Sequence, residues 1–183
     1  MDRRNVLEIM ATAALGFVVA GSAAVAQQKP ISDRLVGAWT LLLDDGVRPD
    51  GSHAPTFGPN PIGTLIFTPN WRYSLQIMRA INRGPFASND RDAGTADENK
   101  AVSQGTISHF GTYTVDEASK TINFRIEGSS FPNWENTTQK RLVTAITDEV
   151  LTYTNPTSST PAQGFTHTEL LWKKVKQSPE GRS

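Results

Sequence analysis

Alternation of hydrophobic and polar residues is the main pattern in this chain, and it is clearest over residues 62–78 (IGTLIFTPNWRYSLQIM). Leu65 and Phe67 take every second position of a first run. A second run follows with the alternating set Trp71, Tyr73, Leu75 and Ile77. A period of two is typical of β-strands. Between the runs, Pro69 fixes its own φ and Asn70 tolerates left-handed backbone, so the segment is predicted to form a β-hairpin.

Further runs of strand type occur before and after this hairpin. They cover residues 35–43, 106–115, 121–127, 139–147, 149–154 and 166–175. Short polar junctions at 116–120 and 147–148 are typical of hairpin loops, and links this short exclude parallel pairing. The pattern predicts an all-β fold, an eight-stranded antiparallel up-and-down barrel rather than a two-sheet sandwich. Eight strands enclose an interior that is either filled by side chains or holds one small ligand.

Two long connections interrupt the strands. Residues 46–61 contain four prolines and three glycines, which predicts a loop near one mouth of the barrel. Residues 79–94 are polar and predict a second loop. Thr95 and Glu98 then form a capping box, and Gly105 is placed to end a helix over residues 96–104. This short inserted helix has few apolar residues, so we expect it to lie over an opening rather than in the core.

The first 26 residues have the pattern of an export signal. Arg3 and Arg4 precede an apolar run at 9–19, and the A-x-A sequence of residues 24–26 predicts cleavage before Gln27. Both the general secretory and the twin-arginine routes stay open. An uncleaved membrane anchor is the alternative, but the apolar run is too short to span a bilayer. Cleavage leaves one barrel domain at 27–175 and a tail at 176–183 that we expect to be flexible, in a periplasmic or secreted protein.

Composition excludes several classes of function. The formal net charge is zero, which disfavours nucleic acid as a partner. The chain has no cysteine, so disulfides and thiolate metal sites are unavailable. The three histidines are far apart in sequence, and no nucleotide, dinucleotide or serine-hydrolase motif occurs, so we expect neither metal nor cofactor. We expect no membrane span in the mature form, and a monomer or a weak homo-oligomer.

Candidate site residues come from strand faces that are predicted to point inward. His109 shares a face with Ile107, Val115 and Tyr113, and the hairpin contributes Tyr73 and Ile77. A buried histidine with a purely structural hydrogen bond is the alternative for His109. His53 and His167 are expected at the surface.

The connection at residues 128–141 supplies two more candidates. Trp134 lies where a barrel rim is expected, and residues at the rim of a barrel often contact the ligand. Arg141 follows on the next strand, and either charged or apolar residues of 121–127 face the interior. If Arg125 and Glu127 point inward with Arg141, the cavity suits a carboxylate-bearing or hydroxylated ligand; if they point out, it suits a plain hydrophobe. Asp44 and Asp45, at the end of the first strand, are interpreted as capping or solvated residues.

Several motifs resemble a known family. Gly37-Ala38-Trp39 has the G-x-W form found at the start of lipocalins, where the tryptophan closes one end of the barrel and a basic residue of the last strand lies across it. Here Lys173 or Lys174 would replace the usual arginine. The segments LVGAW, PIGTLIFTPNWRYSLQIM, HFGTYTVD, EGSSFPNW and ELLWKK are together similar to the bacterial and fungal lipocalin-like domain proteins, over nearly the whole mature chain.

The resemblance has two departures, and three hypotheses of function stay open. Asn123 and Phe124 stand where a histidine pair is expected, and Lys173 and Lys174 stand where an acid and an arginine are expected. The first hypothesis is an exported barrel that binds a small, mainly apolar molecule. The second is an enzyme of isomerase or cyclase type, with His109 or Tyr113 as acid or base. A third is a filled, purely structural barrel, and the fold alone does not decide among them.

Overall fold

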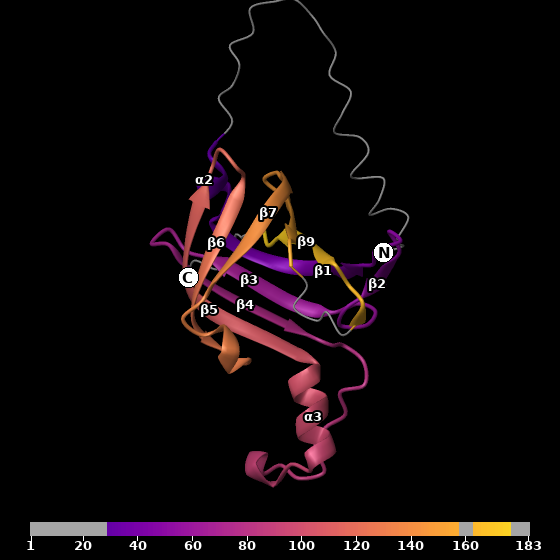
Figure 1. The fold of residues 1–183 in the computed structure, drawn as a ribbon. Coiled ribbons are helices and arrows are strands. Elements are labelled where there is room, and N and C mark those ends of the chain that lie inside the picture. The colour runs from indigo at the N-terminus through magenta and orange to yellow at the C-terminus, as the bar shows by residue number, and fades with distance from the viewer. Residues whose placement is uncertain (1–28, 158–162, 177–183) are drawn as a thin grey trace, which may run out of the picture.

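The computed structural model describes residues 29–157 and 163–176 (Figure 1). The predicted export signal at 1–26 lies outside the described residues, as does the predicted tail apart from Lys176. None of the helices in these two described ranges is both long enough and apolar enough to cross a bilayer.

Nine antiparallel strands form one sheet. They are β1 (Gly37–Val47), β2 (His53–Pro55), β3 (Ile62–Phe67), β4 (Arg72–Met78), β5 (Thr106–Asp116), β6 (Thr121–Ser129), β7 (Thr138–Ile146), β8 (Val150–Asn155) and β9 (His167–Lys174). Neighbours in the sheet follow chain order from β3 to β9, and β9 pairs back to β1, which closes an eight-stranded barrel. The predicted up-and-down barrel is therefore confirmed. The short β2 pairs only with β1, inside the segment expected to be a loop.

The predicted hairpin is β3 and β4, paired from Ile62 with Met78 to Phe67 with Tyr73. The inward alternation holds along both strands, because every second residue is buried. Trp71 is the exception. It lies in the turn at φ 63° with 48% of its surface exposed, so the left-handed residue is Trp71 and not Asn70.

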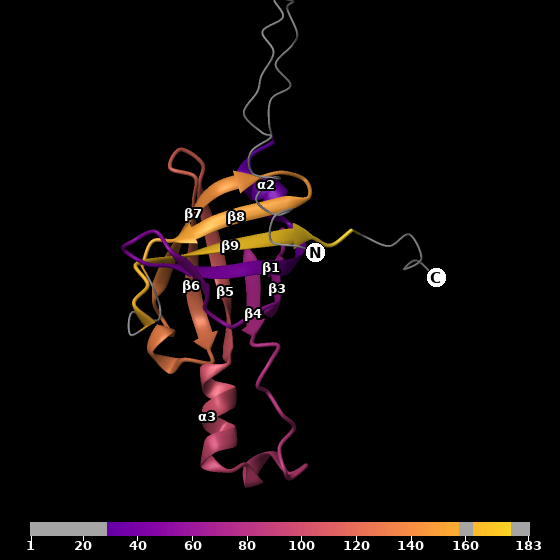
Figure 2. The ribbon, with the colours of Figure 1, turned by 90° about the vertical axis from the view of Figure 1, so that its right-hand side faces the viewer.

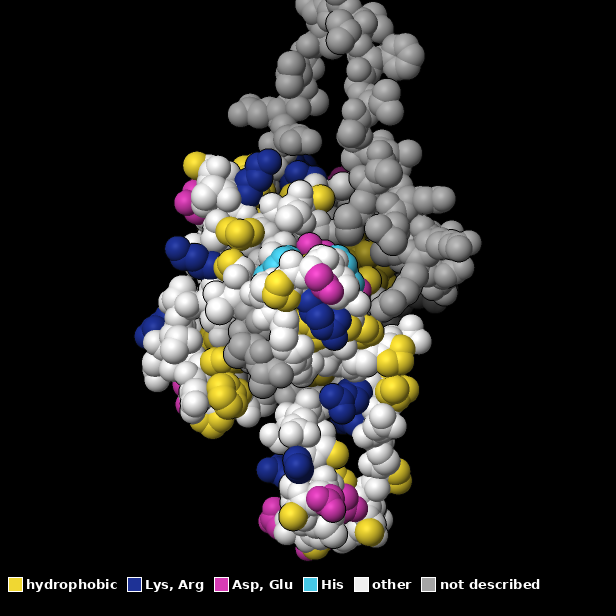
Figure 3. Space-filling view, turned by 45° about the vertical axis from the view of Figure 1, so that its right-hand side comes forward, with side chains coloured by type: hydrophobic (Ala, Val, Ile, Leu, Met, Phe, Trp, Pro, Cys, Tyr) yellow, Lys and Arg dark blue, Asp and Glu magenta, His cyan; other side chains and the backbone are white. Residues whose placement is uncertain are grey.

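The inserted helix α3 (Ala96–Gln104) forms as predicted. The Thr95 hydroxyl accepts the Glu98 backbone N–H at 3.3 Å, and the Glu98 carboxylate accepts the Thr95 N–H at 2.7 Å. As expected, this helix is not part of the core, and only its last two residues border the opening of the barrel. It buries none of its residues and projects away from the barrel with the preceding loop (Figures 1 and 2), since its few apolar side chains give no face to pack. Its far end carries acidic and basic side chains (Figure 3).

A short helix that was not predicted, α2 (Ile31–Leu35), packs against one end of the barrel. Its first two residues, Ile31 and Ser32, donate backbone N–H groups to the two Glu117 carboxylate oxygens, each at 2.9 Å. Ile31 and Leu35 are buried. Their spacing of four after Pro30 is the sequence signal for this single helical turn.

The end beside α2 is closed by Trp39, which is fully buried. The indole N–H donates to the Leu35 carbonyl at 2.8 Å. The Lys174 ammonium lies 4.8 Å from the centre of the indole ring and donates to the Arg34 carbonyl at 2.7 Å. The expected lysine across the tryptophan is therefore Lys174, while Lys173 is exposed.

The orientation of β6, which the sequence left open, is resolved. Phe124 and the isoleucines on either side of it are fully buried, whereas Arg125 and Glu127 face solvent. Glu127 accepts two hydrogen bonds from the Arg72 guanidinium, each at 2.8 Å, on the outer surface. Arg141 on β7 points inward. Of the three charged residues that were considered for the interior, only Arg141 points inward, and Arg125 and Glu127 point outward.

Candidate functional site

The barrel contains a cavity of about 980 Å³ at the end opposite Trp39, where the β4–β5, β6–β7 and β8–β9 connections meet. This volume is at the upper end of the range typical of small-molecule sites. Apolar side chains form much of the wall: Phe57, Leu75, Ile77, Ile107, Trp134 and Leu170. The last two residues of α3, Ser103 and Gln104, also border it. The space is therefore a mainly apolar, open-ended cavity inside a closed sheet.

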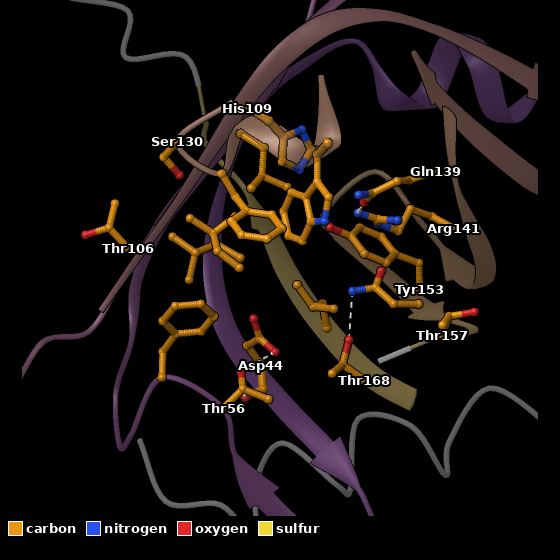
Figure 4. A pocket seen from close by; sticks show the side chains of 18 of the residues that line it. Asp44, Thr56, Thr106, His109, Ser130, Gln139, Arg141, Tyr153, Thr157 and Thr168 are labelled. Atoms are coloured by element: carbon orange, nitrogen blue, oxygen red, sulfur yellow. Dashed lines mark hydrogen bonds between the residues drawn. The ribbon is translucent and has the colours of Figure 1, made fainter. Parts of the chain in front are cut away.

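Polar side chains lie among these apolar ones (Figure 4). Arg141, Gln139 and Tyr153 lie together on one wall, and Asp44 and Thr56 lie apart from them. They come from β7, β8, β1 and the turn after β2, so four separate parts of the chain bring them to one space.

Arg141 is the most unusual of them because only 7% of this charged residue is exposed. Its guanidinium donates to the Lys140 carbonyl at 2.9 Å and to the Gln139 side-chain oxygen at 2.8 Å, and lies 5.3 Å from the centre of the Phe124 ring. Its Nε has no hydrogen-bond partner, and no carboxylate of the described residues forms an ion pair with it. A cationic group is thus held in the barrel by neutral acceptors only.

Tyr153 lies beside Arg141 and is 1% exposed. Its hydroxyl is near the Arg141 guanidinium and the Trp172 indole, but it makes no well-formed hydrogen bond to either. Burial is the main cause that raises the pKa of this hydroxyl, so it stays protonated and can donate.

Asp44 is a buried acid in the same cavity. Its carboxylate accepts a hydrogen bond from the Thr56 hydroxyl at 2.7 Å. Burial raises the pKa of Asp44 to about 7; the Thr56 hydrogen bond and Arg141 oppose this, and the neighbouring Asp45 adds to it. At neutral pH the Asp44 carboxyl is therefore divided between its charged and uncharged forms.

His109 is also buried, and its Nδ1 lies 2.9 Å from the Tyr73 hydroxyl. Burial, and next the charge of Arg141, lower the pKa of His109 to about 3, so the imidazole is neutral at physiological pH. Its ring packs edge-on against Trp134, with 6.0 Å between ring centres. His109 therefore contacts both the buried Tyr73 hydroxyl and the aromatic ring of Trp134 at the rim.

The structure brings together four of the six predicted site residues. Ile77, His109, Trp134 and Arg141 line the cavity. Tyr73 lies behind His109 as its hydrogen-bond partner.

Tyr113 points inward as expected, but toward the closed end of the barrel. Its hydroxyl donates to the Thr68 carbonyl at 3.2 Å, and its ring packs against Phe67 and Trp71. It does not line the cavity. The predicted face therefore runs from the cavity at His109 to the closed end at Tyr113.

Sequence reasoning missed two polar residues of the site, Asp44 and Tyr153. The interpretation of Asp44 as a cap or solvated residue was wrong, because β1 continues to Val47 and a register shift between Leu41 and Leu43 turns Asp44 inward. The bulge moves the inward set from odd to even positions, which a strict period of two does not predict. For Tyr153, the alternation along β8 was the available signal.

The other two histidines lie outside the cavity. His53 on β2 and His167 on β9 are each within 4.0 Å of the Glu169 carboxylate, at 3.9 and 3.7 Å. Figure 3 shows histidine side chains beside acidic ones on this face. Within the part of the chain that the structure describes, no group of three or more such residues is placed to hold a metal ion.

The chain was compared with protein families, curated proteins and solved structures. A family model described as a lipocalin-like domain matches residues 36–175. Among solved structures, a lipocalin-like protein from Bacteroides uniformis ATCC 8492 aligns with 14% identity and a TM-score of 0.41, covering 78% of this chain and 99% of that one. A redesigned beta barrel aligns with 14% identity and a TM-score of 0.39, covering 80% and 95%. No curated protein matches the sequence.

Proposed function

The chain belongs to the lipocalin-like domain family, and from this membership and its cavity we propose that it is an exported barrel that binds one small, mainly apolar molecule. One observation carries the proposal, namely the cavity of about 980 Å³ between apolar walls at the open end. A filled structural barrel would have side chains in that space. The mixture of apolar walls with a few polar groups is usual for a small-molecule site.

A second function, an enzyme of isomerase or cyclase type, is favoured by one further observation. Asp44 has its pKa raised to about 7, and the neutral imidazole of His109 lines the same cavity. A carboxyl that titrates near neutral pH is suited to general acid or base catalysis. Tyr113, the other candidate acid or base, lies outside the cavity lining, so Asp44 takes its place beside His109 in this alternative.

Titration with a neutral fluorescent probe, N-phenylnaphthylamine, tests the binding function. We expect saturable binding to the wild type, and much weaker binding to Ile107→Trp, which places a large side chain in the cavity wall. The matched control is Ile66→Trp, because Ile66 is on the outer surface of β3 and is 39% exposed. Absence of saturable binding to the folded wild type would contradict the proposal.

Native mass spectrometry of protein purified from its own host tests both candidate functions. A retained small molecule of constant mass supports binding, whereas turnover of that molecule on incubation supports the enzyme. Asp44→Asn separates the two, because it abolishes turnover but leaves the apolar walls for binding.

Export has its own test. N-terminal sequencing of the protein from the exported fraction should begin at Gln27, after the A-x-A pattern of residues 24–26. An intact Met1 in that fraction would contradict cleavage at this site.

A further inference from the structure

We infer that the bound molecule is a monocarboxylate, whose acidic group is held by Arg141 and the Tyr153 hydroxyl while its apolar part lies against Leu75, Ile77 and Ile107. This inference rests on the proposed binding function and specifies the class of ligand. It follows from the burial, the unpaired polar atoms and the charge balance of the cavity.

The burial of Arg141 is the first step. Removing a guanidinium from water is unfavourable unless charged or well-placed acceptors replace the water. Here the acceptors are the Lys140 carbonyl and the Gln139 side chain, which are both neutral. Hydrogen bonds from an arginine to a carboxylate are about twice as strong as those to neutral groups. An anion would therefore compensate Arg141 better than these two neutral groups do.

The unpaired atoms are the second step. Arg141 Nε and Tyr153 Oη are both buried and both lack a hydrogen-bond partner, although the two side chains are neighbours in the cavity wall (Figure 4). Each can donate one hydrogen bond, and buried donors in native proteins are almost always paired. A carboxylate has two oxygens and accepts from both, which satisfies the two donors with one group.

The charge balance is the third step. Arg141 is the only cation among the buried side chains of the described residues. Asp44 forms no ion pair with it, and Asp44 is only partly charged at neutral pH because burial raises its pKa to about 7. His109 is neutral. Two other cations line the cavity, but Arg79 is half-buried and Lys140 is exposed, so water screens their charges. The one buried positive charge matches one negative charge on the ligand, so a monocarboxylate fits better than a doubly charged phosphate.

Competition against bound N-phenylnaphthylamine tests the ligand class in the wild type. The competitors are decanoate, decanol and decyl phosphate, which share one alkyl chain and differ only in the head group. We expect decanoate to displace the probe at concentrations at least about tenfold lower than decanol, since the charge-assisted hydrogen bonds add to the same apolar burial. Decyl phosphate should compete less well than decanoate.

Two variants assign the preference to its residues. Tyr153→Phe removes one unpaired oxygen, and Arg141→Met removes the charge while keeping most of the length of the side chain. In Arg141→Met, decanoate and decanol should compete equally; in Tyr153→Phe, the preference for decanoate should fall several-fold. The matched control is Arg125→Met, an arginine on the neighbouring strand that faces solvent, in which the preference should be unchanged.

The outcomes separate this inference from the proposed function. If the probe binds and decanol competes as well as decanoate in the wild type, the monocarboxylate is wrong and the binding function stands. The same holds if decyl phosphate competes best. If Arg141→Met does not fold, Tyr153→Phe decides, because an unchanged preference there contradicts the assigned site. If the probe does not bind the folded wild type, the binding function itself fails.

Discussion

The two ends of this barrel differ in how many of their polar side chains have hydrogen-bond partners. At the closed end three side chains each donate to a backbone carbonyl: Trp39 donates to Leu35, Lys174 donates to Arg34, and Tyr113 donates to Thr68. At the cavity end, among the described residues, four lining side chains keep an unpaired polar atom. They are Thr106, Arg141, Tyr153 and Asn155.

This difference separates stability from binding within one sheet. A buried polar group without a partner costs on the order of 1–3 kcal/mol of stability, so native proteins retain few of them. Four around one cavity imply that water or a ligand completes their hydrogen bonds there. Outside the cavity lining, the described residues have one further unpaired buried atom, the Trp172 indole nitrogen, whereas Trp39, Lys174 and Tyr113 at the closed end all have partners. Substitutions at the closed end should therefore change stability, whereas those in the cavity should change binding or pH dependence.

The largest effect is expected from Trp39→Ala at the closed end. The fully buried indole fills the barrel between α2 and Lys174, and its loss leaves a cavity, so the free energy of unfolding should fall by about 3–5 kcal/mol. Trp71→Ala is the control, because Trp71 is 48% exposed in a turn and should cost much less. Denaturant unfolding measures both. Equal losses in the two variants would contradict the distinct role of Trp39.

Asp44→Asn should stabilise the fold at neutral and higher pH, because the buried Asp44 carboxylate lowers the free energy of unfolding once it is charged. Burial raises the pKa of the Asp44 carboxyl from its ordinary value of 3.8 to about 7, so between these pH values the folded state holds a proton that the unfolded state lacks. This contribution favours folding at low pH and is lost as the pH rises through 7. Asparagine removes the charge and can still accept the Thr56 hydrogen bond.

The advantage of Asp44→Asn over the wild type should therefore grow with pH and reach a few kcal/mol above pH 7, since one unit of pKa is worth about 1.4 kcal/mol. His109 has the opposite sign: its pKa is lowered to about 3, so its contribution is lost as the pH falls through 6.5 to 3. That contribution is common to both proteins and cancels in their difference. Unfolding curves across this pH range give the measurement, and a difference independent of pH would refute the shift at Asp44.

The sequence predicted the closed end better than the cavity end, and the reason is physical. Regular alternation of apolar and polar residues predicted the hairpin. The G-x-W motif predicted the buried Trp39 and a lysine of the last strand across its ring. Asp44 was misplaced because a bulge between Leu41 and Leu43 reverses the alternation. Such a bulge has no marker in the local sequence.

The inner charge also needed the three-dimensional structure. Arg125 and Arg141 have similar surroundings in the sequence. In the closed sheet Phe124 points inward, so its neighbour Arg125 points outward, whereas Arg141 on the paired strand points inward and lies over the Phe124 ring. The unpaired state of Tyr153 is likewise a property of the assembled cavity. Periodicity assigns residues to faces, but it does not assign hydrogen-bond partners across strands.

Lys174→Met should have an intermediate effect at the closed end. The substitution removes the ammonium group, and with it the contact with the Trp39 ring and the hydrogen bond to the Arg34 carbonyl. Together these two interactions contribute about 1–2 kcal/mol to the free energy of unfolding at a partly exposed site. Lys173→Met is the matched control, since that adjacent lysine is exposed and should change stability by less than about 0.5 kcal/mol. Equal effects on the melting temperature in both variants would show that Lys174 makes no special contribution.

The smallest effect, and the most direct comparison of the two ends, comes from removing one oxygen at each. Tyr113→Phe loses the hydrogen bond to the Thr68 carbonyl and should cost about 1 kcal/mol of stability. Tyr153→Phe removes an oxygen that has no partner in the unliganded barrel, so stability should change by less than about 0.5 kcal/mol or increase slightly. Both are Tyr→Phe changes at side chains that are 2% and 1% exposed, so burial of the ring cancels between them. Denaturant unfolding without ligand measures the pair. A larger loss for Tyr153→Phe than for Tyr113→Phe would show that the Tyr153 hydroxyl stabilises the fold and is not held free for a ligand.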